Sequence, residues 1–245
     1  MRASALRAQT RTEVALTLRR GESVLLTLGI PVALLVFFSL ADVLPVPDGV
    51  DDAVDFLFPG VLALAVMSAA MVGPAIATGF EREYGVLKRL AVTPLGRPAL
   101  IAAKTVGILA VEVVQVLVLT AVAVLLGWGS DGTQPLVALA AVLLGTIAFA
   151  GLGLLLGGVL PGLTTLAAAN GLYVLLLLVG GMLFPLESLP GWLQGASRLL
   201  PPASLADLLH GALAPDGDLP ARAWLVLGAW AVAGPAAAAR WFRWV

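Results

Sequence analysis

Charged side chains are sparse in this 245-residue sequence, and one short segment is unusually rich in them. The segment EREYGVLKRL, residues 81–90, holds five charged side chains, although only 12% of all residues are charged. Two glutamates come first and a lysine and an arginine come last, an order that complements the dipole of a short helix. We therefore expect a short charged helix here, with an apolar stripe at helical spacing formed by Tyr84, Leu87 and Ala91.

The ends and the shape of this helix are predicted from single residues. Thr78 and Glu81 fit a capping box, which predicts that a new helix begins there. Gly85 costs about 1 kcal/mol relative to alanine inside a helix, so we expect a bend or a close backbone approach at this position. Pro94 is expected to end the helix.

Arrangements typical of an enzyme or a cofactor site are missing from the sequence. His210 is the only histidine and there is no cysteine, which makes a metal site a poor expectation. Lys104 and Thr105 follow Ala103 and lack the glycines of the pattern Gly-x-x-x-x-Gly-Lys-[Ser/Thr], which cradle phosphate oxygens. We therefore expect that the protein is not an enzyme and that this chain binds no cofactor by itself.

The elements that must position the charged segment are six long apolar runs. Mean hydropathy is +1.02, and a bilayer core of about 30 Å is crossed by about 20 apolar residues in a helix. The runs that meet or approach this length are 23–41, 56–80, 100–128, 135–160, 163–186 and 223–239. They predict an all-α integral membrane protein with six transmembrane helices, in one domain over residues 23–245.

The distribution of basic residues predicts the orientation of the spans. With the N-terminus in the cytoplasm, twelve of the fourteen lysines and arginines lie on the cytoplasmic side, and only Arg198 and Arg222 lie outside. We therefore expect both termini and the loop 81–99 in the cytoplasm. The segment 187–221 is expected outside, with a short helix before the last span.

Residues 1–22 form an N-terminal segment of their own. They carry five arginines among scattered apolar residues, which is typical of an amphipathic helix lying in the membrane interface. We interpret this segment as an interfacial helix, and membrane lipid, anionic lipid above all, is one expected partner.

Three polar residues fall inside the predicted spans. Glu112 is a candidate functional residue because a charge at the bilayer centre costs about 2.5–3.5 kcal/mol on insertion scales. Gln115 falls on the same helix face, and Asn170 lies in the fifth run. We interpret these three residues as a candidate substrate pathway. An interhelical hydrogen bond, or a protonated Glu112 at a helix or dimer contact, stays open as an alternative.

The charged segment resembles the coupling loop of type-2 ATP-binding-cassette exporter permeases, a family that includes daunorubicin-resistance-like permeases. The matching residues are Glu81, Arg82, Glu83, Gly85, Leu87, Lys88, Leu90, Thr93, Pro94 and Lys104. Residues 184–213 are also similar to the family, with matches at Leu189, Pro190, Trp192, Leu193, Pro201 and Asp207. Val86 and Ala103 depart from the pattern, which often has threonine and glycine there, and this bears on how the loop packs.

The resemblance implies that the charged segment is a coupling helix that docks in a cleft of a separate ATPase subunit. The residues that it assigns to this coupling are Glu81, Arg82, Glu83, Tyr84, Gly85, Leu87, Lys88, Arg89 and Leu90. It also implies that the N-terminal helix contacts the ATPase, an interpretation compatible with the lipid anchor. ATP and Mg²⁺ would be bound by two copies of that cytoplasmic partner.

The resemblance further implies a dimer of permeases, homomeric or heteromeric, in the bacterial plasma membrane. It would move an amphipathic drug, antibiotic, lipid or glycan outward, as in multidrug efflux and antibiotic resistance. Two other functions stay open: a secondary transporter with Glu112 as its proton carrier, and a membrane scaffold without transport. We expect no nucleic-acid partner.

Overall fold

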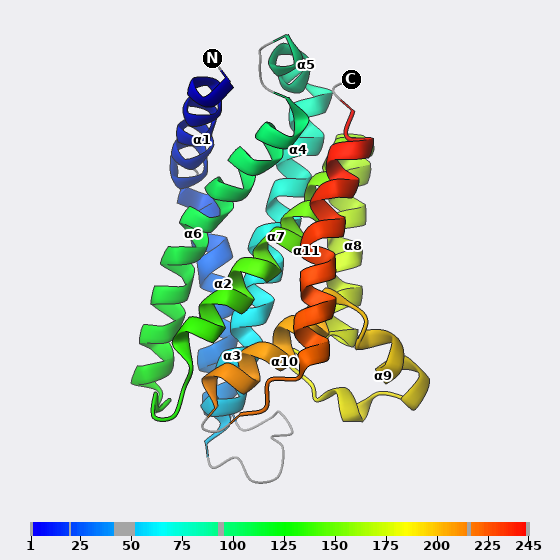
Figure 1. The fold of residues 1–245 in the computed structure, drawn as a ribbon. Coiled ribbons are helices and arrows are strands. Elements are labelled where there is room, and N and C mark those ends of the chain that lie inside the picture. Colours follow the sequence, from blue (N-terminus) through cyan, green and yellow to red (C-terminus); the bar gives the residue numbers. More distant parts are fainter. Residues whose placement is uncertain (1, 20, 42–51, 93–95, 215–216, 244–245) are drawn as a thin grey trace.

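The computed structural model describes residues 2–19, 21–41, 52–92, 96–214 and 217–243, and all regular structure in these ranges is helical (Figure 1). This confirms the prediction of an all-α protein for the described part of the chain. The elements are α1 Arg2–Arg19, α2 Gly21–Ala41, α3 Ala53–Met67, η1 Ser68–Val72, α4 Gly73–Glu83, α5 Val86–Ala91, α6 Arg97–Leu125, α7 Pro135–Val159, α8 Gly162–Val179, η2 Leu186–Ser188, α9 Gly191–Ser197, α10 Pro201–Leu213 and α11 Ala221–Trp241.

Five helices of the described ranges are long and apolar enough to cross a membrane. They are Ala53–Glu83, which joins α3, η1 and α4, followed by α6, α7, α8 and α11. These five match the second to sixth apolar runs of the sequence. The first run falls in α2, whose described apolar part, Thr27–Ala41, is shorter. A count of six spans therefore stays a prediction.

Helix α7 packs against α4, α10 and α11. Small residues allow the close approach to α4 and η1. A Cβ atom added at Gly153 would collide with the backbone oxygen of Met71, and one at Gly157 would collide with the backbone oxygen of Ala75. The two glycines form the Gly-x-x-x-Gly spacing that permits such close packing of helices in membranes.

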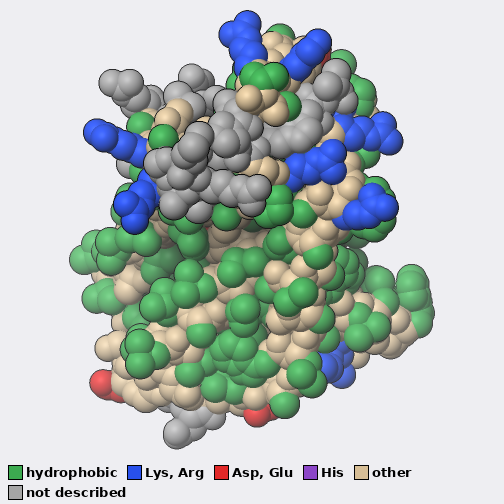
Figure 2. Space-filling model, turned by 45° about the horizontal axis from the view of Figure 1, so that its top comes forward, with side chains coloured by type: hydrophobic (Ala, Val, Ile, Leu, Met, Phe, Trp, Pro, Cys, Tyr) green, Lys and Arg blue, Asp and Glu red, His purple; other side chains and the backbone are tan. Residues whose placement is uncertain are grey.

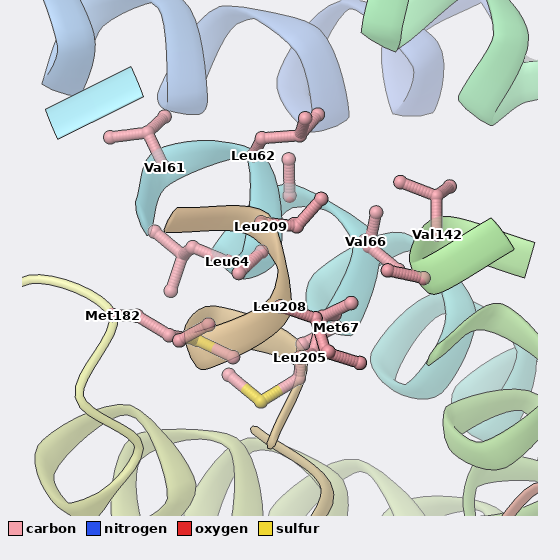
Figure 3. Close-up of a cluster of buried hydrophobic side chains, with 14 of the residues drawn as sticks. Val61, Leu62, Leu64, Val66, Met67, Val142, Met182, Leu205, Leu208 and Leu209 are labelled. Carbon is pink, nitrogen blue, oxygen red and sulfur yellow. The ribbon is translucent and has the colours of Figure 1, made fainter. Parts of the chain in front are cut away.

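The main hydrophobic core lies where α3, α7 and α10 meet (Figure 3). Helix α10 is too short to be a span, and it packs between the longer helices so that most of its side chains are buried. Figure 3 shows Leu205, Leu208 and Leu209 of α10 beside Leu64 and Met67 of α3. The segment predicted as a short helix before the last span is therefore helical, and it forms part of the core.

The fifth span ends earlier than the sequence indicated. Helix α8 stops at Val179, whereas the apolar run continues to residue 186. The next two residues are glycines, and Gly181 has a φ of 67°, a left-handed conformation that glycine adopts without steric cost. The chain therefore turns away at this point, although its residues stay apolar.

The two ends of the bundle differ in charge. The N-terminus, α5 and the C-terminus lie at one end, and α9 and α10 lie at the other (Figure 1). Figure 2 shows lysine and arginine side chains gathered at the first of these ends, which we call the basic end. Its described members are Arg7, Arg11, Arg82, Lys88, Arg89, Arg97, Lys104, Arg240 and Arg243.

Candidate functional site at the basic end

The charged segment begins inside a long helix, and not at a new one. Helix α4 continues through Thr78 to Glu83 without a break, and the side chain of Thr78 is buried in the protein interior. The predicted capping box at Thr78 and Glu81 is therefore wrong. Its sequence pattern was present, but Glu81 is engaged by a lysine of another helix, described below. The short helix that follows is α5, and the expected stop at Pro94 lies outside the described residues.

The bend predicted at Gly85 is confirmed. Gly85 has φ 72° and ψ 13°, a left-handed conformation, and it separates α4 from α5. The amide of Tyr84 donates to the carbonyl of Phe80 at 2.9 Å, and the amide of Gly85 donates to that of Arg82 at 3.0 Å. A residue with a Cβ atom is disfavoured in this conformation, so glycine allows the tight turn between the two helices.

Helix α5 has a buried side and an exposed side. Leu87 is fully buried, and it packs with Leu100 of α6 and Phe242, with Leu90 beside them. The exposed residues of α5 are Val86, Lys88, Arg89 and Ala91, and Tyr84, in the turn before the helix, is exposed as well. The apolar stripe predicted from spacing is therefore only partly correct, because Tyr84 is 71% exposed and stacks on Phe80.

The last turn of α4 contacts the link between α7 and α8. Arg82 Nη1 donates to the backbone oxygen of Gly158 at 3.1 Å, and the backbone amide of Arg243 donates to the same oxygen at 2.9 Å. Gly162, at the start of α8, lies so close to Phe80 and Glu83 that a Cβ atom there would collide with both side chains. A movement of this turn would therefore displace the α7–α8 link or break these contacts.

Lys104 is buried at the centre of an ion cluster that joins three helices. Its Nζ lies 2.8 Å from Glu81 Oε2 of α4 and 3.3 Å from Glu13 Oε1 of α1. Gln9 Nε2 also donates to Glu13 Oε1, at 2.8 Å. We call Lys104, Glu13 and Glu81 the Lys104 cluster. Through Lys104 of α6, it links α1 to the last turn of α4.

The polar residues predicted inside the spans lie in different surroundings. Glu112 and Gln115 are both buried, on one face of α6. Thr146 of α7 donates to Glu112 Oε2 at 2.5 Å, and Gln115 Nε2 donates to the backbone oxygen of Thr27 at 2.8 Å. Asn170 is exposed on α8, where its Nδ2 donates to the carbonyl of Leu166 within the same helix.

Several residues of these contacts were not singled out from the sequence. Glu13, Thr146, Gly158, Gly162 and Phe242 each meet a partner far away in the chain. For Glu13 a signal existed, because it is the single acid among the first twenty residues, which carry five arginines. The other four have no local feature that separates them from neighbours of the same type.

A second polar group lies at the opposite end, on α10. Asp207 Oδ2 pairs with Arg222 Nη2 at 2.9 Å. Burial raises the pKa of Asp207, and Arg222 partly offsets that rise. The ring nitrogens of His210 lie 2.8 Å from the carbonyl oxygen of Ala206 and 3.0 Å from that of Phe56 in α3. Burial lowers the pKa of His210 despite these two carbonyl contacts.

Known proteins resemble most of this chain. Residues 4–213 match the family described as "ABC-2 type transporter". The "Putative transport permease YvfS" of Bacillus subtilis (strain 168) is 27% identical over 204 residues, which cover 80% of each chain. The "Probable multidrug ABC transporter permease YbhR" of Escherichia coli (strain K12) is 26% identical over 171 residues, which cover 67% of this chain and 45% of that protein.

The match confirms the resemblance noted in the sequence, and it spans both the charged segment and α10. With its long apolar helices, the chain is a multi-pass membrane protein. It belongs to the ABC-2 type transporter family.

Proposed function

We propose that this chain is the permease subunit of an ABC exporter, and that the segment 81–91 docks on a separate ATPase subunit. The observation that carries the proposal is the two-sided packing of α5. Leu87 holds one side of the helix against α6 and Phe242, while Lys88 and Arg89 are exposed, as is Tyr84 in the turn before the helix. A docking helix needs an exposed side that its partner can bind and a buried side that fixes it to the membrane-spanning helices.

The exposed side has the composition of a protein interface. Tyrosine and arginine are enriched among the residues that dominate binding energy, and both are present here. Val86 is 41% exposed and Val92 is 88% exposed, which adds apolar surface beside the charged residues. Because the family is that of ABC transporters, an ATPase with complementary acidic and apolar groups is the partner that fits this surface best.

The fixed side supports the transmission of movement into the bundle. The turn that carries Arg82 and Glu83 contacts Gly158 and Gly162, which lie at the end of α7 and the start of α8. We propose that ATP binding and hydrolysis on two ATPase subunits move this turn, and that α8 follows. ATP and Mg²⁺ belong to the partner in this proposal, and this chain does no hydrolysis.

The remaining features of the transporter are proposed from the family and from charge. Two permease copies, identical or similar, form the pathway in the bacterial plasma membrane. The basic end with both termini lies in the cytoplasm, as the positive-inside rule favours. The printed name of YbhR includes "multidrug", which supports an amphipathic drug as the substrate class, moved outward. An antibiotic, a lipid or a glycan is compatible with the same pathway.

A second candidate role rests on two buried oxygen atoms of α6. Within the described residues, Glu112 Oε1 and Gln115 Oε1 are buried and accept no hydrogen bond. Buried acceptors without a donor are costly, so they favour a bound donor such as a cationic substrate group or a proton. Glu112 would then contact the substrate or carry the proton of a secondary transporter, and Asn170 remains a weaker candidate. Glu112→Gln should reduce transport in either case.

Co-purification tests the docking proposal. The tagged protein is purified in mild detergent, and ATPase activity is measured in the eluate. Lys88→Glu with Arg89→Glu reverses two exposed charges of α5, and Arg240→Glu with Arg243→Glu reverses two exposed charges elsewhere at the basic end. We expect ATPase activity with the wild type and the second variant, and a loss with the first. Equal activity in both variants would contradict docking on α5.

A further inference from the structure

The contact between α1 and α6 includes a buried charge, Lys104. Helix α1 packs along α6, and only 6% of the Lys104 side chain is exposed. Glu13 and Glu81 are 12% and 20% exposed. A buried lysine is retained at low cost only where carboxylates and hydrogen bonds surround it. The three residues therefore form one unit, in which Lys104 pairs with both carboxylates and each carboxylate is stabilised by Lys104.

The chemistry of lysine suits a junction of this kind. Its ammonium group has three N–H donors and no acceptor. Lys104 Nζ donates to Glu81 Oε1 at 3.0 Å and to Glu13 Oε2 at 3.4 Å. The ammonium group therefore lies between a carboxylate from α4 and a carboxylate from α1. Loss of its charge would leave two carboxylates facing each other, and they would repel.

Glu81 connects the Lys104 cluster to the segment proposed to dock on the ATPase. Glu81 is in the same last turn of α4 as Arg82, which holds the α7–α8 link, and this turn leads into α5. A displacement of that turn must move α1 with it or break the ion cluster. We infer that Lys104 is a positioning residue that joins α1 to the α4–α5 segment, so that both move as one unit. The movement rests on the proposed function, whereas the junction itself does not.

Spin-label distances in the full-length protein test the junction. The chain has no cysteine, so labels can be attached to introduced ones alone. Ala8→Cys in α1 and Ala91→Cys in α5 are conservative changes at exposed positions. In purified protein in lipid nanodiscs, we expect a narrow distance distribution that becomes broad in Lys104→Gln. Lys104→Arg keeps the charge and should keep the narrow distribution, whereas Lys104→Met, which keeps a similar length without the charge, should broaden it.

Two variants keep the test decisive. Lys88→Gln is the matched control, because Lys88 is the other lysine of the chain and is exposed on α5; its distribution should stay narrow. Glu13→Gln removes one carboxylate at the edge of the cluster, and it should broaden the distribution even if Lys104→Gln fails to fold. A narrow distribution in Glu13→Gln, or a broad one in Lys104→Arg, would overturn the inference.

The movement is tested separately, in the complex with the co-purified ATPase. On addition of ATP, the distance between the two labels should stay constant in the wild type and change in Glu13→Gln. A wild-type distance that changes with ATP would overturn the inference that the two elements move together. Absence of any bound ATPase would instead contradict the proposed function, and the distances measured without partner would still decide on the junction.

Discussion

Arg82 and Gly158 are 76 positions apart in the sequence, and the guanidinium Nη1 of the first donates to the backbone oxygen of the second at 3.1 Å. This hydrogen bond joins the charged segment to the α7–α8 link. The carbonyl of Gly158 is also held by the amide of Arg243, so three parts of the chain meet at one oxygen atom. Arg82 therefore has a structural role inside the protein, in addition to any role of the charged segment in docking.

Removal of this hydrogen bond should loosen the start of α8. A hydrogen bond from a charged donor contributes about 1.5–3 kcal/mol, and we expect the lower end because Arg82 is half-buried. In Arg82→Ala, hydrogen exchange of the amides in 158–165 should become faster than in the wild type. Arg89→Ala, at an exposed position of α5, is the control and should leave this segment unchanged. Equal exchange in both variants would show that the hydrogen bond does not hold the link.

Substitution of Gly85 should destabilise the turn between α4 and α5. A left-handed conformation costs an ordinary residue about 1–2 kcal/mol, and asparagine tolerates it better than alanine. We expect the melting temperature to fall in Gly85→Ala and to fall less in Gly85→Asn. Gly191→Ala serves as the control, because a Cβ atom there meets nothing within 4 Å. A Gly85→Ala protein as stable as that control would contradict the strained turn.

Two glycines of neighbouring spans should respond in opposite ways to alanine. Gly157→Ala forces a Cβ atom against the backbone of α4, and overpacking of this kind costs about 1–3 kcal/mol. Gly171→Ala enters open space on α8 and gains up to about 1 kcal/mol of helix propensity. Thermal unfolding in detergent distinguishes them: the melting temperature should fall for the first and hold or rise for the second. The reverse order would be inconsistent with the close packing of α7 on α4.

The stability of the α10 end should depend on pH through His210. Burial lowers its pKa in the folded protein below the ordinary value of 6.5, so below that pH the unfolded chain binds more protons. The favourable contribution of neutral His210 is therefore present above pH 6.5 and is lost as the pH falls. Asp207 is the charged group that acts on His210, and Arg222, Arg198 and Glu187 in turn act on Asp207; none of these four residues changes in His210→Gln.

Unfolding measured from pH 7.5 down to pH 5 checks this expectation. Wild-type protein should lose more stability over the interval than His210→Gln does. The opposite result, a variant more sensitive to acid, would mean that protonated His210 stabilises the folded protein by donating to the carbonyls of both Phe56 and Ala206. Both carbonyls lie within hydrogen-bond distance of its ring.

The sequence predicted those parts of the fold that depend on local patterns. Long apolar runs located the five long apolar helices, since a membrane span needs little more than length and hydrophobicity. Gly85 predicted a bend because a left-handed residue is a property of one position. The end of α8 at Val179 was missed, because hydrophobicity continues past the two glycines that turn the chain.

Long-range contacts of the candidate site were beyond sequence reasoning. Glu81 fitted a capping box by spacing, yet its partner is Lys104, 23 positions away. Lys104 in turn reaches Glu13, 91 positions away. Leu87 and Lys88 are adjacent in the sequence, but Leu87 is buried and Lys88 is exposed. Leu87 is buried because it packs against Phe242, which is far from it in the sequence. Such pairings are set by the tertiary fold and not by residue type or spacing.

Cross-linking in the living host tests the central claim most directly. Lys88→Cys and Arg198→Cys each place a single cysteine at an exposed position, the first on α5 and the second at the opposite end of the bundle. After treatment with a membrane-permeant cross-linker, the products are identified by mass spectrometry. We predict that Lys88→Cys is joined to an ATP-binding-cassette ATPase and that Arg198→Cys is not. An ATPase joined to Arg198→Cys, or none joined to Lys88→Cys, would contradict the account.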